Sequence, residues 1–267
     1  MSSVMFRRAL WGLRWTVFWY ALGIALYVAI VLSAYPTVRG NAADIQSLLE
    51  SYPDTLLRAL GASRDLASLP SYLGVESLNL IWPLIVAIFV IMSGAAVVAQ
   101  EVERGTADLW LSVPESRARL LLGKLVALLV GVVVLALATD VMLGLGALLV
   151  GSALGLGQLA ALATLLIAFP LAIAGYAALF SALMSERSKA AALAAALTLG
   201  FYLIWVVAGL IARLHWLGYL SIFTAYDPTP TLAGGDVPWL HVLVLVLVGL
   251  LCAGGALVVF TRRDIAT

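Results

Sequence analysis

Charged residues, cysteine and histidine are all scarce in this sequence. Charged residues make up 11% of the 267 positions, cysteine occurs once and histidine twice. A soluble domain averages about 25% charged and roughly 45–50% apolar residues, whereas 64% of this chain is hydrophobic. A soluble fold could not cover so much apolar surface with so few charges. The composition therefore excludes an ordinary soluble protein and predicts a membrane protein.

The same scarcity excludes several chemistries. The single cysteine, Cys252, can form no intrachain disulfide. The histidines His215 and His241 have no thiol nearby in the sequence, so we expect no metal site. The net charge is only +1 and no polar segment carries a basic stripe with interleaved aromatics, so we expect no nucleic-acid partner. No catalytic pair or zinc motif suggests a membrane-embedded enzyme.

Six apolar runs are long enough to cross a bilayer, which takes about 20 residues. Hydrocarbon offers no partners to backbone polar groups, so each run is expected to be helical. The expected spans are residues 15–35, 75–99, 120–150, 158–184, 190–211 and 239–260. The sequence thus predicts an all-α, polytopic membrane protein with six transmembrane helices, forming a single transmembrane domain over residues 1–267.

The lysines and arginines predict the orientation of these spans, because they concentrate on the cytoplasmic side of membrane proteins. With six spans, four of the 15 fall on the outer side, namely Arg39, Arg58, Arg64 and Arg213, and the other eleven on the inner side. We therefore expect both chain termini in the cytoplasm and a multi-pass protein of the plasma membrane.

Two long segments are expected on the outer side. The first, residues 36–74, has apolar residues at helical spacing and is broken by Pro53 and Pro70, which favours short amphipathic helices. The second, residues 213–238, is too apolar for a free loop. It either lies in the membrane interface or dips into the membrane and returns.

Between the second and third spans, residues 100–119 carry most of the cytoplasmic charge. Gly105 can end the preceding helix in a left-handed conformation, and Thr106 can cap a short new helix. Pro114 ends that helix, and Ser116 can cap the third span. Such a short surface helix suits docking to a soluble partner, whereas the alternative is an interfacial turn that binds lipid headgroups.

Polar and aromatic residues within the spans are candidates for a substrate pathway. Asp140 is the only acidic residue well inside a span, which by default suggests function. The alternative is that it packs on a partner helix or faces an outer, water-filled vestibule. The other candidates, which are also compatible with simple packing, are Asn79, Trp82, Tyr176, Tyr202 and Trp205.

The order E-x-x-R-G-T, a short apolar stretch, P-x-S-R and then L-L-L-G-K, within Glu101 to Lys124, resembles the membrane subunits of ABC-2 type transporters. Residues 32–36, 52–61 and 260–264 are similar to bacterial members of that family. The resemblance covers essentially the whole chain, including its size and six spans. It implies an ABC-2 exporter-like transmembrane domain in the inner membrane of a prokaryote.

The resemblance also implies roles for particular segments. It implies an interfacial helix at residues 4–14 before the first span, and short re-entrant helices within residues 213–226. It further implies a helix-loop-helix over residues 100–119 that engages an ATPase. The residues expected to couple to that ATPase are Glu101, Glu103, Arg104, Gly105, Thr106, Leu109, Pro114, Ser116 and Arg117.

The chain lacks the G-x-x-x-x-G-K-[ST] loop that holds nucleotide phosphates. Around its only Gly-Lys pair, Gly123-Lys124, Ala118 stands in place of the first glycine and Leu125 in place of the Ser or Thr. We read Lys124 instead as a residue that snorkels to the inner interface. We therefore expect no enzyme activity and no cofactor in this chain, with ATP and Mg²⁺ bound by a separate ATPase.

The expected function is that of a permease subunit in an ATP-driven exporter of a hydrophobic or amphipathic substrate. Its expected partners are two copies of the ATPase, a second permease copy or a paralogue, and membrane lipid. The alternative is a non-transporting ABC-type membrane subunit that acts in sensing or in the maturation of another protein.

Overall fold

The computed structural model describes residues 3–50, 68–105 and 116–263, which fold into helices joined by short connections. The helices, in chain order, are α1 (Ser3–Gly40), α2 (Ala42–Glu50), α4 (Leu69–Leu73), η1 (Gly74–Leu78), α5 (Ile81–Ala95), α6 (Ala99–Glu103), α8 (Arg117–Leu149), α9 (Leu156–Leu183), α10 (Arg187–Leu210), η2 (Ala212–Leu220), α11 (Pro228–Gly234) and α12 (Trp239–Arg262). The predicted all-α class is confirmed.

Five helices, α1, α8, α9, α10 and α12, are long and apolar enough to cross a membrane. A sixth span forms if the bent pair of Leu69–Leu78 and Ile81–Ala95 is counted as one. The chain is therefore a multi-pass membrane protein. In place of one uninterrupted second span over residues 75–99, the chain bends by 41° before α5 and breaks again after Ala95.

Pro83 accounts for the position of the bend. A proline ring clashes with the carbonyl group four residues earlier, which here belongs to Asn79, between η1 and α5. The π-helical turn η1 ends there, with the Asn79 amide bonded to the carbonyl of Gly74. Pro170, by contrast, lies inside α9, which continues through it.

At the N-terminus the structure corrects two expected boundaries. The interfacial helix 4–14 and the span 15–35 are one continuous helix, α1, which runs on through Pro36 to Gly40. No glycine or proline stands at residues 14–15 to separate them. In the first outer segment the structure describes α2 and α4, with Pro70 in the first turn of α4. Pro53 lies outside the described residues.

Helix α9 forms the centre of the bundle. It contacts α5, α8, α10, α11 and α12, and two-thirds of its apolar window is buried. Two glycines allow its closest approach. A Cβ atom added to Gly175 would lie 2.4 Å from the carbonyl oxygen of Gly249 on α12, and one added to Gly249 would lie 2.7 Å from the Leu171 oxygen. Backbone therefore packs directly on backbone here.

The second outer segment partly returns to this core. Helix η2 contacts the end of α10 and exposes Trp216 and Tyr219. The chain then turns inward, and the buried rings of Phe223 and Tyr226 pack on Phe169 of α9, with ring centroids 5.1 and 4.5 Å apart. Of the two arrangements left open by the sequence, the segment therefore combines surface exposure with return to the core.

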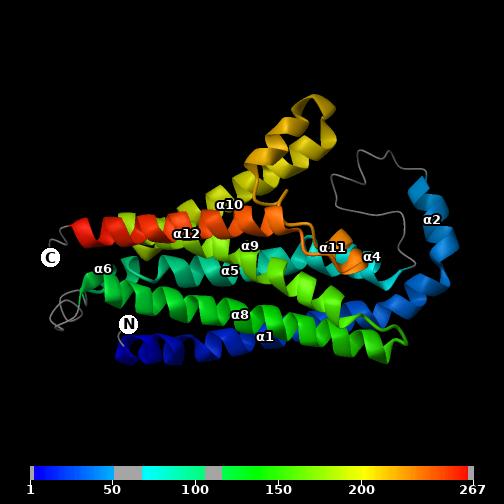
Figure 1. Ribbon diagram of the computed structural model, residues 1–267, viewed down its shortest axis with the longest axis horizontal. Helices are drawn as coiled ribbons and strands as arrows, with labels where there is room; N and C mark the ends of the chain where they lie inside the picture. The colour runs from blue at the N-terminus through cyan, green and yellow to red at the C-terminus, as the bar shows by residue number, and fades with distance from the viewer. Residues whose placement is uncertain (1–2, 51–67, 106–115, 264–267) are drawn as a thin grey trace.

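Figure 1 shows how the helices are arranged along the long axis of the molecule. Both ends of the chain lie at one end of the bundle, together with α6. Helices α2, α4 and α11 lie at the opposite end. The segment singled out by the sequence therefore begins on the same side as the two termini.

Candidate functional site

The candidate site is the joint where α5 ends and α6 begins. Residues 96–98 break the helix, which leaves backbone groups on both sides without intrahelical partners. Ser181 of α9 satisfies them. Its fully buried hydroxyl donates to the carbonyl oxygen of Ala95 at 2.7 Å and accepts from the amides of Val98 and Ala99, both at 2.9 Å. One side chain thus holds the joint to the central helix.

A second contact ties α6 to α8. The Nζ atom of Lys124 lies 3.1 Å from the Oε1 atom of Glu101 and donates to the carbonyl oxygen of Val97 at 2.8 Å. The side chains are 16% and 27% exposed, so this ion pair is shielded from solvent more than a surface pair is. The ammonium group of Lys124 thus has two partners at the joint, which the sequence did not predict, and its reach to the inner interface stays a prediction.

A third contact ties α6 to α10. The Oε2 atom of Glu103 accepts a hydrogen bond of 2.9 Å from the backbone amide of Arg187, the first residue of α10. A carboxylate at a helix N-terminus pairs with an unsatisfied amide and with the positive end of the helix dipole. Through these three contacts the five-residue helix α6 is fixed to α8, α9 and α10 at once.

Gly105 and Ser116 flank the rest of the predicted coupling segment. Gly105 has φ +65° and ends α6 in the left-handed region, as predicted. Ser116 caps α8, because its side chain accepts from the amide of Arg119, which is also as predicted. The predicted coupling residues Thr106, Leu109 and Pro114 lie outside the described residues. Arg104 is exposed at the end of α6.

The C-terminus of α12 is tied to the same end of the bundle. Arg117 Nη1 donates to the carbonyl oxygen of Arg263 at 2.8 Å. The guanidinium of Arg263 in turn donates to the carbonyls of Ala182 and Met184, at 2.8 and 3.1 Å, and to the Ser185 hydroxyl at 2.7 Å. Arg263 therefore satisfies orphan carbonyls at the end of α9, as cationic residues do at helix C-termini.

The predicted pathway residues do not converge on one cavity. Trp82 is buried, donates to the Thr139 hydroxyl at 2.8 Å and stacks on Tyr226. Tyr176 is buried and shares a hydrogen bond with Thr198. In this chain both residues have packing partners on neighbouring helices.

The remaining pathway candidates differ in their surroundings. Tyr202 and Trp205 are half-buried and pack around Phe223, and Asn79 donates to Thr229 at 3.3 Å. Asp140 is 8% exposed, and its buried Oδ1 atom has no hydrogen-bond partner among the described residues. An unpartnered buried carboxylate oxygen is costly, so Asp140 is the pathway candidate that packing explains least.

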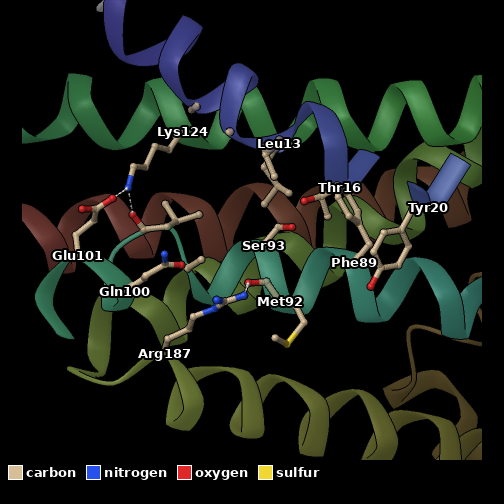
Figure 2. A pocket seen from close by; sticks show the side chains of 15 residues that line it. Leu13, Thr16, Tyr20, Phe89, Met92, Ser93, Gln100, Glu101, Lys124 and Arg187 are labelled. Atoms are coloured by element: carbon tan, nitrogen blue, oxygen red, sulfur yellow. Dashed lines mark hydrogen bonds and ion pairs between the residues drawn. The ribbon is translucent and has the colours of Figure 1, made fainter. Parts of the chain in front are cut away.

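A cavity of about 310 Å³ adjoins the joint (Figure 2). It lies between α1 and α5 and reaches Lys124 and Arg187. Leu13, Thr16 and Tyr20 reach into it from α1. Sequence patterns gave no signal for this cavity, because it depends on how α1 packs against the α5–α6 joint.

Two residues central to this end of the bundle, Ser181 and Arg263, were not among the predicted site residues. Ser181 lies in the sequence Ala-Leu-Phe-Ser-Ala-Leu, where a lone serine has no distinguishing pattern. Arg263 follows the last span, where a basic residue is expected from orientation alone. Their partners lie about 80 residues away along the chain, a relation that only the fold reveals.

A family model described as "ABC-2 family transporter protein" matches residues 5–265, which is nearly the whole chain. No curated protein matches the sequence closely enough to count as a relative.

Proposed function

The chain belongs to the ABC-2 transporter family, and we propose that it is the permease subunit of an ATP-driven exporter powered by a separate ATPase. In this proposal the ATPase docks on α6 and on residues 104–117, and its closure on ATP moves this segment. The observation that carries the proposal is the attachment of α6 to α8, α9 and α10 by three separate contacts. A displacement of α6 would reach all three helices.

The position of the joint supports a cytoplasmic docking site. Figure 1 places α6 at the same end as both chain termini. Arg117, Lys124, Arg187 and Arg263 belong to this end through the contacts described above. Basic residues concentrate on the cytoplasmic side of membrane proteins, where ATP is available. We therefore place the joint and both termini in the cytoplasm of a prokaryote.

The assembly proposed for this chain contains two ATPase copies and a second permease, either an identical copy or a paralogue. ATP and Mg²⁺ belong to the ATPase, because this chain has no phosphate-binding loop of the P-loop type. The substrate pathway would form between the two permeases, with Asp140 as its strongest candidate residue. Its buried, unpartnered Oδ1 atom supports this choice. The apolar spans favour a hydrophobic or amphipathic substrate.

The test is co-purification of the tagged full-length chain with the ATPase from its native membranes. We expect an ATPase to co-purify and its activity to rise when it is bound to the permease in vesicles. Glu103→Ala and Gly105→Ala should reduce both binding and stimulation, whereas Arg262→Gln, at the same end of the bundle, should not. If Glu103→Ala and Gly105→Ala retained full binding and stimulation, the proposed docking site would be wrong.

The same experiment separates transport from the non-transporting alternative. In vesicles reconstituted with the complex of permease and ATPase, ATP should drive accumulation or depletion of an amphipathic dye. A complex that couples normally yet moves no amphipathic compound would favour the sensing or maturation role instead.

A further inference from the structure

The cavity beside the joint combines apolar walls with unbalanced positive charge. Leu13 and Phe89 contribute apolar surface, and Lys124, Arg187 and Glu101 contribute charge. Glu101 is already paired with Lys124. Among the described residues, no carboxylate pairs with the Arg187 guanidinium, and its buried Nε atom lacks a hydrogen-bond partner. The Nη2 atom of Arg187 donates to the carbonyl oxygen of Met92 at 3.2 Å, which is a neutral partner. The cavity therefore has an excess cation whose charge no described carboxylate balances.

A further cation lies near Lys124, and several hydroxyl groups line the cavity. Arg8 of α1 lies close enough to Lys124 for a repulsive interaction between them. Thr16, Tyr20 and Ser93 bring hydroxyl groups to the cavity wall, as Figure 2 shows. Cationic side chains with neighbouring hydroxyl donors are the groups that bind phosphate oxygens. The charge distribution thus favours an anionic, phosphate-bearing ligand.

The depth of the cavity in the membrane indicates where such a ligand comes from. Lys124 is the seventh residue after Arg117, where α8 begins, so it lies about 10 Å along the helix at ~1.5 Å per residue. The headgroup region of one leaflet is about 5–8 Å thick. Taking Arg117 as the residue at which α8 enters the headgroup region, Lys124 is placed near the inner edge of that region and the apolar walls next to the acyl chains.

We propose that this cavity binds the phosphate headgroup of an anionic phospholipid from the leaflet next to α6, with Arg187 as its principal contact. The volume of about 310 Å³ suits a small headgroup. Leu13 and Phe89 would contact the first part of the acyl chains. The bound lipid would supply the negative charge that the Arg187 guanidinium lacks.

Gly12 offers a way to fill the cavity without changing its charges. It lines the cavity, and a Cβ atom added to it would meet nothing within 4 Å. Gly12→Leu therefore places a side chain in open space. Gly23, on the same helix, is equally free of neighbours but does not line the cavity, so Gly23→Leu is the matched control. A second pair of variants alters charge. Arg187 lines the cavity, so Arg187→Gln removes a charge from it. Arg262 does not line the cavity, so Arg262→Gln is the control.

The experiment is native mass spectrometry of the delipidated full-length chain titrated with dioleoyl phosphatidylglycerol or dioleoyl phosphatidylcholine. We expect the wild type, Gly23→Leu and Arg262→Gln to bind phosphatidylglycerol at least about tenfold more tightly than phosphatidylcholine. Arg187→Gln should weaken phosphatidylglycerol binding by about tenfold. Gly12→Leu should weaken binding by a similar factor because its side chain fills the cavity, although all charges are retained. Equal binding of the two lipids by the wild type would overturn the proposal.

Two further outcomes distinguish the ligand source and a folding defect. Inorganic phosphate that displaced phosphatidylglycerol at equal concentration would indicate a site for a soluble anion and overturn the lipid assignment. Circular dichroism reports whether each variant is folded. If Arg187→Gln failed to fold, Gly12→Leu would decide the matter, because unchanged lipid binding by that variant contradicts the proposal.

Discussion

The hydroxyl group of Ser181 lies 2.7 Å from the carbonyl oxygen of Ala95, the last residue of α5. The Ser181 hydroxyl oxygen also accepts hydrogen bonds from the amides of Val98 and Ala99, on the other side of the break. A helix break inside a membrane bundle needs such partners, because each unsatisfied backbone group costs free energy there. Ser181 therefore makes the change of direction between α5 and α6 compatible with burial.

Ser181→Ala should destabilise the protein, because it leaves three backbone groups at the joint without their partner. We expect a loss of about 1–3 kcal/mol, the cost of unsatisfied buried polar groups, and weaker stimulation of the ATPase. Thermal unfolding in detergent measures the first effect. Ser33→Ala is the matched control, since the exposed Ser33 hydroxyl bonds only to its own helix at Ile30. Equal melting temperatures for the two variants would contradict the role given to Ser181.

The ion pair between Glu101 and Lys124 should show measurable coupling. A double-mutant cycle with Glu101→Gln and Lys124→Gln should give an interaction free energy on the order of 1 kcal/mol, because the pair is largely shielded from solvent. The exposed pair Glu186–Lys189 serves as control and should couple by less than about 0.5 kcal/mol. A smaller value for the shielded pair than for the exposed one would show that Lys124 does not hold α6.

Gly175→Ala should force α9 and α12 apart, since the new Cβ atom would lie 2.4 Å from the Gly249 oxygen. Overpacking of this kind costs about 1–3 kcal/mol. At Gly200 of α10, nothing lies within 4 Å of an added Cβ atom. Gly200→Ala should therefore leave the melting temperature unchanged or raise it slightly through better helix propensity. If both variants melted alike, the close approach of α9 and α12 would be disproved.

Asp140→Asn separates function from packing at that position. Removing a buried charge whose Oδ1 atom has no partner should stabilise the protein by about 1–3 kcal/mol. The melting temperature should rise accordingly. If Asp140 contributes to the substrate pathway, the same variant should lower transport while ATPase binding persists. Unchanged transport in a stabilised variant would assign Asp140 to packing alone.

The sequence predicted the helices well where apolar runs were long, and less well where backbone partners decided the geometry. Arg117–Leu149 and Trp239–Arg262 lie within a few residues of the expected spans, because composition alone sets such lengths. The bend before α5 depends on a π-helical turn, and the break after Ala95 on a serine 86 residues away. Neither leaves a periodic signal.

Small residues illustrate the same limit. Ala196 and Gly200 are spaced four residues apart on α10, a spacing that favours close helix contacts, yet nothing lies within 4 Å of a Cβ atom added to Gly200. The close contacts occur at Gly175 with Gly249 and at Gly94 with Ala177. Regular spacing shows that one face of a helix carries small side chains. Whether that face makes a close contact depends on which helix lies opposite it.

The local features of the candidate site were more predictable. Gly105 and Ser116 act through their own backbone and the adjacent turn, so their residue types sufficed. The roles of Glu103 and Lys124 depend on α10 and on α6, which meet them only in the folded chain. The sequence therefore identified Gly105 and Ser116, which flank the segment, but neither the break at residues 96–98 nor the groups that hold the joint together.

The uninterrupted length of α1 has a mechanical consequence. Its 38 residues extend about 57 Å at ~1.5 Å per residue, nearly twice the ~30 Å of a bilayer's hydrocarbon. A rod of that length acts as a lever: a tilt of about 5° at one end carries the other through about 5 Å. Any rocking of α1 against α8 would consequently displace residues at both surfaces of the membrane at the same time.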